Sequence, residues 1–269
     1  MTALSPAQPA STRVSSDRLA GLAPLVRKDM TEWFRGLRAP VTAAVVSLFM
    51  VLTAANAWIN AFIAERLPEN VTPPAPMSQA PLDNLGIAIG TQVFVLAAIL
   101  AVSGLMARER ESGTLAWVAS KPVSRASIWL AKWSAASIML AVTAVVVPIV
   151  ATVVTVVVLY GMPDPVAVAA ITAGAIALVV FYAALGLAIS TVLPGVVPVV
   201  AVSFAVFALW PLIGGIVPSV AQATPMAIFE WAAGAAVGAP VGPVTPIAWA
   251  IGTALVVALA VRRMRSIEL

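Results

Sequence analysis

Residues 166–189 read VAVAAITAGAIALVVFYAALGLAI, a run of 24 residues without a charged side chain. A helix of about 20 apolar residues crosses the roughly 30 Å hydrocarbon core of a bilayer. The rest of the chain is similar, because 61% of its 269 residues are hydrophobic and only 10% are charged. Soluble domains carry about 25% charged residues, so a soluble globule of this size could not cover its surface. The sequence therefore predicts an all-α integral membrane protein, and excludes a soluble enzyme, a nucleic-acid-binding protein and a secreted mini-domain.

Two residue types are missing from the chain, which contains neither Cys nor His. Without Cys there is no disulfide, thiolate nucleophile or iron–sulfur cluster, and without His there is no imidazole metal ligand or general base. An intramembrane hydrolase would need a nucleophile with its base, or a metal cluster. We therefore expect no catalytic, cofactor-binding or metal-ligating residue on this chain.

Six apolar segments are predicted to span the membrane within a domain that covers residues 41–261. They lie near 41–63, 85–107, 128–159, 166–189, 196–217 and 243–261. The third segment is too long for one untilted crossing, and we expect its first turns at the cytoplasmic interface. Lys132 at the bilayer centre would cost about 2.5–3.5 kcal/mol on insertion scales, whereas near the end of the span it can snorkel to water.

Basic residues are segregated along the chain. Every Lys and Arg except Arg66 precedes the first span, lies near the junction of the second and third, or follows the last. The positive-inside rule then predicts a multi-pass protein of the cell membrane with both termini cytoplasmic, including the tail 262–269. Two cytoplasmic ends require an even number of spans, which supports six. The Gly- and Pro-rich stretch 218–242 is predicted to be an outer segment with one or two short helices dipping into the membrane, covered by protein or facing a water-filled cavity.

The N-terminal region has two parts. Residues 1–20 are polar, lack an apolar signal-peptide core and are predicted to form a disordered cytoplasmic tail. Residues 21–40 are predicted to form an amphipathic interfacial helix, because apolar residues recur at helical spacing. Trp33 and Phe34 belong to the apolar face, and Arg35 and Arg38 to the polar remainder. Such a helix suits the plane of the membrane interface; the alternative is a solvated flank that anchors the first span.

A polar loop at residues 108–127 is longer than a simple connection requires. Residues 108–133 read RERESGTLAWVASKPVSRASIWLAKW. Gly113 permits a sharp turn, and Thr114 begins or caps a short apolar helix with Leu115 and Trp117. Pro122 disfavours helix at the residue before it, and Ser124 is a good N-cap for a helix that starts at Arg125. The apolar side chains between charged flanks need cover from lipid, from the rest of the chain or from a partner.

This loop resembles the signature of type-2 ABC exporter permeases. The matching residues are Glu109-x-Glu111-x-Gly113-Thr114-Leu115, then Lys121-Pro122-Val123-Ser124-Arg125, and then Lys132 at the entry of the third span. The amphipathic helix and the six spans are also similar to that family, so the resemblance covers nearly the whole chain after residue 20. The chain departs from the family at AWVAS, residues 116–120, where a Leu-rich run is usual.

The resemblance implies that the chain is the membrane half of an ATP-driven exporter. ATP and Mg²⁺ would bind a separate ABC ATP-binding subunit, and the chain has no G-x-x-x-x-G-K-[ST] loop of its own. A second permease chain, identical or different, would complete the unit, with the lipid membrane as the other partner and no nucleic acid. The loop 108–127 would be the coupling loop that docks on the ATPase. In it Glu109 and Glu111 would position the segment, while Leu115 and Trp117 would fill a groove on the partner.

A transporter or channel driven by an ion gradient is the alternative function. Such proteins usually place charged residues near the bilayer midplane. The predicted spans carry only Asn56, Asn60 and Gln92, with several Ser and Thr, away from their ends. Asn56 and Asn60 could line a polar path or bond to a neighbouring helix. The apolar spans suit an amphiphilic cargo, and equally a polar path that forms only between two chains.

Overall fold

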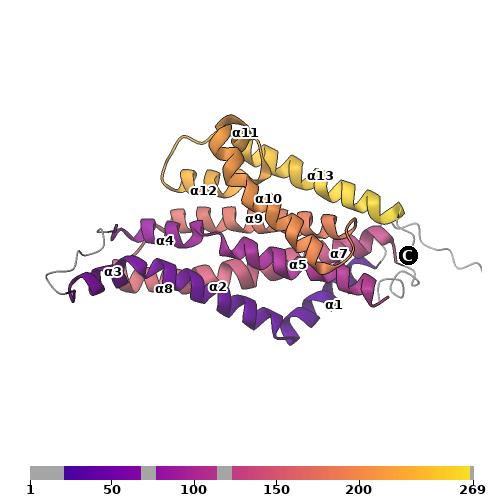
Figure 1. Cartoon of the computed structure of the whole chain (residues 1–269), viewed down its shortest axis with the longest axis horizontal. Coiled ribbons are helices and arrows are strands. Elements are labelled where there is room, and N and C mark those ends of the chain that lie inside the picture. The colour runs from indigo at the N-terminus through magenta and orange to yellow at the C-terminus, as the bar shows by residue number, and fades with distance from the viewer. Residues whose placement is uncertain (1–20, 68–76, 114–122, 267–269) are drawn as a thin grey trace, which may run out of the picture.

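The computed structural model describes residues 21–67, 77–113 and 123–266. The predicted tail 1–20 lies outside them, as do Thr114, Leu115, Trp117 and Pro122 of the 108–127 loop. Within the described residues all regular secondary structure is helical (Figure 1). The helices are α1 (Leu22–Arg35), α2 (Arg38–Ala54), α3 (Asn56–Ala64), α4 (Pro81–Gly90), α5 (Val93–Glu111), α7 (Arg125–Leu140), η1 (Ala141–Val146), α8 (Val147–Tyr160), α9 (Pro165–Ser190), α10 (Val196–Ile216), α11 (Pro218–Gln222), η2 (Pro225–Ala227), α12 (Ile228–Ala236) and α13 (Val244–Ser266).

The chain is an all-α integral membrane protein, as the composition predicts. Five helical stretches are long and apolar enough to cross a membrane: Pro81–Glu109, Arg125–Tyr160, Pro165–Ser190, Val196–Ile213 and Val244–Ser266. The count becomes six if α1 and α2, which meet at a bend of 63°, are taken together as one span. Helix α2 continues into α3, because the Ala55 amide donates to Val51 and the Ile59 amide donates to Ala55. The apolar segment predicted near 41–63 thus corresponds to α2 and α3, and α1 precedes it on the other side of the bend.

Two spans depart from regular α-helix. The second is interrupted between α4 and α5, where Gln92 has a φ of 51°; nothing in the sequence predicts this break. The third contains the π-helical turn η1 just before Pro148. Proline has no amide hydrogen, and its ring would clash with the carbonyl four residues earlier in a regular helix. A wider turn at this point accommodates the ring without ending the span.

Helix α9 forms the centre of the bundle, next to α5, α7, α12 and α13 (Figure 1). It is buried on several faces, with Leu178, Tyr182 and Leu187 almost inaccessible. Helix α12 lies against it at Gly174, where an added Cβ would collide with Ala232. The stretch 218–242 thus folds back on the bundle as short helices; its position relative to the membrane faces stays a prediction.

Candidate functional site

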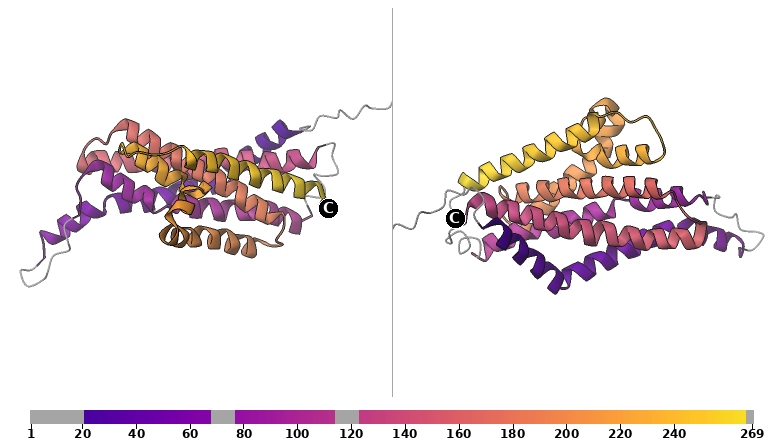
Figure 2. Two further views of the ribbon diagram at one scale, coloured as in Figure 1. Left: turned by 90° about the horizontal axis from the view of Figure 1, so that it is seen from above. Right: turned by 180° about the vertical axis from the view of Figure 1, so that it is seen from behind.

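One end of the bundle gathers the segments that the sequence analysis singled out. The N-terminal end of α1, the end of α5, the start of α7 and the end of α13 all lie there in both views of Figure 2. This end, which we call the basic end, carries Arg108, Arg125 and Arg263 near the ends of α5, α7 and α13, and Arg38 lies at the bend between α1 and α2. The end of α3, the start of α4 and the α8–α9 connection lie at the opposite end.

A buried ion cluster joins three elements at the basic end. Lys132 on α7 places its Nζ 2.7 Å from Glu109 Oε1 on α5 and 3.7 Å from Asp29 Oδ2 on α1. Lys132 is only 7% exposed, so the prediction that it snorkels to water is wrong. Carboxylates from two other helices surround the ammonium group and take the place of water. Buried charges in proteins are normally compensated in this way.

The cluster carries one more negative than positive charge when all three groups are ionised. Burial raises the pKa of Asp29, and the nearby negative charge of Glu109 acts in the same direction; the positive charge of Lys132 opposes them. Glu109 makes the shorter contact and is the main partner of Lys132. Asp29, at 3.7 Å, is therefore the weaker partner of Lys132, and its burial favours the protonated form of the carboxyl.

Asp29 was not among the residues predicted for the site, although the sequence contains a signal for it. It lies seven residues after Leu22, four after Leu25 and three after Val26, in the middle of the apolar face of α1. A charge on the buried face of a helix needs a partner on a neighbouring element. Here that partner is Lys132, itself a single charge within an apolar run.

The apolar face of α1 packs mainly on the protein and not on lipid. Leu25, Val26 and Met30 contact the core, and Trp33 is only 4% exposed. Phe34 is 47% exposed and remains available to lipid. The interpretation of Trp33 as a lipid-facing residue is therefore wrong, because the bend between α1 and α2 turns α1 against α7.

The described ends of the 108–127 loop are held by close contacts. Gly21, at the start of α1, adopts a φ of 83°, and any side chain there would collide with Val123. Ser124 accepts a hydrogen bond from the Ser127 amide at 3.0 Å and caps α7, which begins at Arg125 as predicted. The Arg125 guanidinium donates to the Arg265 carbonyl at 3.4 Å. The loop is thus attached to both α1 and α13.

The two glutamates of the loop signature serve different neighbours. Glu109 binds Lys132, whereas the Glu111 carboxylate lies beside Gly195, 3.7 Å from the position that a Cβ would take there. Gly195 precedes α10, so Glu111 is close to the positive end of that helix dipole. Gly113 follows with a φ of 70°, in the left-handed region that favours glycine.

The polar residues that an ion-driven transporter would use do not gather into a path. Asn60 donates to Asn56 at 3.2 Å, one turn away on α3, and both amides approach the Met77 sulfur. Gln92 lies separately, at the break before α5. Within residues 21–67, 77–113 and 123–266 no group of three acidic side chains could hold a metal ion.

A bundle of long apolar helices, with an amphipathic helix packed at its basic end, is the fold of a polytopic membrane protein. The sequence matches the ABC-2 family transporter protein over residues 23–234, and the chain belongs to this family. It is thus a permease subunit of an ABC transporter, a membrane transport component and not a catalytic one, as the resemblance implies. No curated protein matches the sequence at a significant level.

Proposed function

We propose that this chain forms the translocation path of an exporter that is driven by a separate ABC ATP-binding subunit. ATP and Mg²⁺ bind that subunit, and a second permease chain completes the unit. Both termini and the basic end face the cytoplasm in the cell membrane. The segregation of basic residues supports this orientation, and family membership supports the association with an ATPase.

The proposed mechanism rests on the ion cluster at the basic end. Glu109 and Lys132 belong to the two helices that flank the 108–127 loop, and Asp29 belongs to α1. A push on the loop from the closing ATPase therefore reaches the second span, the third span and α1 together. Packed interfaces of this kind transmit small displacements as rigid-body movements.

The side chains of the 108–127 loop suggest how it contacts the ATPase. Leu115 and Trp117 fill a groove on the ATPase, where one aromatic anchor contributes a large part of the binding free energy. Glu111 holds the loop against the start of α10, and Gly113, Thr114, Pro122, Ser124 and Arg125 shape it.

Co-expression with a candidate ABC ATP-binding subunit tests the proposal. The pair is expected to co-purify, and reconstituted vesicles are expected to hydrolyse ATP at a rate that depends on both subunits. If the two proteins neither co-purify nor affect each other's activity, the chain works without that ATPase, and the ion-gradient alternative gains support.

A further inference from the structure

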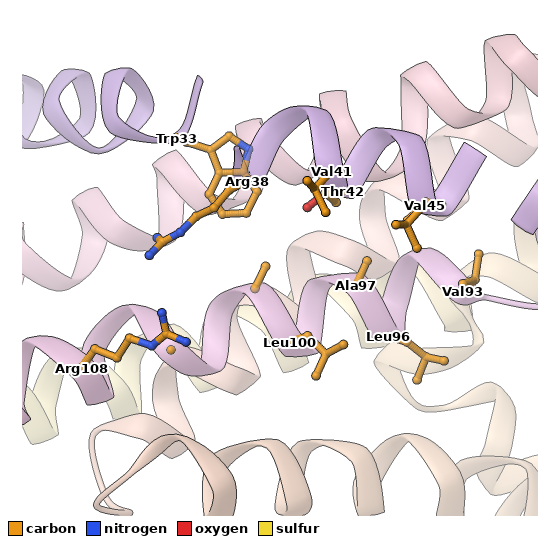
Figure 3. Close-up of a pocket in the computed structure, with 13 residues that line it drawn as sticks. Trp33, Arg38, Val41, Thr42, Val45, Val93, Leu96, Ala97, Leu100 and Arg108 are labelled. Atoms are coloured by element: carbon orange, nitrogen blue, oxygen red, sulfur yellow. The ribbon is translucent and has the colours of Figure 1, made fainter. Parts of the chain in front are cut away.

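A pocket of about 520 Å³ lies between α2 and α5 (Figure 3). Its walls are apolar, with Val41 and Val45 on one side and Leu96 and Leu100 on the other. Leu100 is 64% exposed and Val45 is 60% exposed, so in this chain alone the pocket opens outward. The volume falls in the range of about 300–1,000 Å³ that is typical of ligand sites.

Two arginines define the basic end of this pocket. Arg38 starts α2 and Arg108 lies near the end of α5, and Figure 3 shows their guanidinium groups extending toward the same opening. Gly104 lets Arg108 lie back along α5, since a Cβ at Gly104 would come within 3.3 Å of the Arg108 Nε. Both charges are thus directed to the mouth of an apolar pocket.

Neither arginine has an acidic partner within 4 Å in the part of the chain that the structure describes. Asp29, Glu32 and Glu109 line a smaller neighbouring cavity together with both arginines. Their ion pairs within 4 Å are with lysines: Glu32 with Lys28 at 3.5 Å, and Asp29 and Glu109 with Lys132. Trp33 lines the same end, and its buried Nε1 has no acceptor among the described residues. Buried polar groups normally have a partner, so this end of the pocket has unused donor capacity.

The size of the pocket matches one membrane leaflet. Its wall on α5 runs from Val93 to Gly104, about 16 Å at 1.5 Å per residue. Half of the roughly 30 Å hydrocarbon core is similar in depth. A bound molecule would thus have an aliphatic chain of leaflet length and an anionic group at the arginines.

We infer that the pocket binds an anionic phospholipid of the leaflet at the basic end. Its phosphate lies between Arg38 and Arg108, whose guanidinium groups form charge-assisted hydrogen bonds with phosphate oxygens. One acyl chain lies along Val45, Leu96 and Leu100. Lipid binding requires neither the ATPase nor transport; only the identity of the leaflet as cytoplasmic rests on the proposed function.

A second copy of the chain is a less suitable occupant. A two-fold contact uses the same patch on both copies, so it would bring the same two arginines of the partner into the interface. Four guanidinium groups without acidic partners would repel one another, whereas a phosphate neutralises them.

Native mass spectrometry of the full-length protein in detergent tests the site, with phosphatidylglycerol and phosphatidylcholine as probes. Phosphatidylglycerol is expected to bind more tightly. Arg38→Gln and Arg108→Gln should each lower its affinity about tenfold, given the usual strength of a charged hydrogen bond, and should remove the preference over phosphatidylcholine. Arg263→Gln is the matched control, because Arg263 lies at the same end outside the pocket. Val45→Trp, which fills the apolar part, should weaken both lipids.

Three results would overturn the inference. One is that the wild-type protein binds the two lipids equally, or that Arg263→Gln loses as much affinity for phosphatidylglycerol as the pocket variants do. Another is that glycerol phosphate displaces phosphatidylglycerol as effectively as the lipid itself does. That result would indicate that the pocket binds a soluble phosphate compound. The third is efficient disulfide formation between two copies of Leu100→Cys, in a protein that otherwise lacks Cys, which would show that a second copy covers the pocket.

Discussion

Lys132 and Glu109 are 23 residues apart in sequence, yet their side chains meet at 2.7 Å. The pair closes the base of the 108–127 loop, because one residue lies on α5 and the other on α7. Asp29 adds α1 to the same contact. The basic end is therefore a junction of three helices around one ammonium group, and its disruption should affect stability and coupling together.

Removal of the central charge should destabilise the protein strongly. Lys132→Met leaves two partly buried carboxylates facing each other, and loss of one partner of a buried ion pair costs about 3–5 kcal/mol. We expect a clearly lower thermal unfolding midpoint in detergent. Lys28→Met, which breaks only the exposed pair with Glu32, should change the midpoint little. An unfolding midpoint for Lys132→Met equal to that of the control would contradict the structural role of the cluster.

Asp29 and Glu109 should respond differently to neutralisation. Burial raises the pKa of Asp29, so its ionised form is less favourable in the folded state than in the unfolded state. The stability that Asp29 contributes is then greatest below its unfolded pKa, and it is lost as pH rises through the folded pKa. Asp29→Asn should remove this pH dependence and cost little at neutral pH. Glu109→Gln should cost more, because it removes the 2.7 Å partner. Unfolding midpoints measured from pH 4 to pH 8 compare the two; a greater loss in Asp29→Asn at neutral pH would reverse the assignment.

The contact between Gly21 and Val123 should exclude any side chain at position 21. Gly21→Ala places a Cβ at positive φ, at a cost of about 1–2 kcal/mol, and drives it into Val123, which adds about 1–3 kcal/mol for overpacking. Gly238→Ala is the control, because Gly238 has a φ of 72° and open space around it. Gly21→Ala should lower the unfolding midpoint more than Gly238→Ala, and Val123→Ala should recover part of the difference. Equal effects would mean that the α1–loop contact is not tight.

Two loop variants should separate docking from coupling. Trp117→Ala should weaken ATPase binding about thirtyfold, as expected for an aromatic anchor worth about 2 kcal/mol. Glu111→Ala should leave the complex assembled but reduce transport-stimulated ATP hydrolysis, because the Glu111 carboxylate lies beside Gly195 at the start of α10. Trp58→Ala, at the opposite end of the bundle, is the control for loss of a Trp. If both loop variants bind and couple like the wild type, the loop is only a connector.

Single cysteines in this Cys-free chain should report its orientation. Met162→Cys in the α8–α9 connection should react with a membrane-impermeant maleimide in intact cells. Ser266→Cys at the end of α13 should react only after permeabilisation. Labelling of Ser266→Cys from outside would place the C-terminus there, and would imply that residues 218–242 form a further crossing.

The sequence alone was sufficient for the fold class, an all-α membrane protein with five or six helices long and apolar enough to cross a bilayer. This class depends on a property read along one dimension, the length of an apolar run against the thickness of a bilayer. The start of α7 was equally predictable, because the Ser124 cap is a contact between residues three apart. The same logic identified the family, whose loop signature lies within one short segment.

Contacts between helices were decided only by the tertiary structure. The bend of 63° between α1 and α2 turns Trp33 inward and places Asp29 beside Lys132. The periodicity of α1 alone predicts that Trp33 faces the membrane surface, and it gives no partner for Asp29. The apolar pattern also does not predict the break between α4 and α5 at Gln92. Periodicity shows which face of a helix is apolar, but lipid and protein interior are equally apolar, so it cannot show which of them covers that face. A buried charge depends in turn on its neighbours, and Lys132 could be placed correctly only once α1 and α5 were seen beside it.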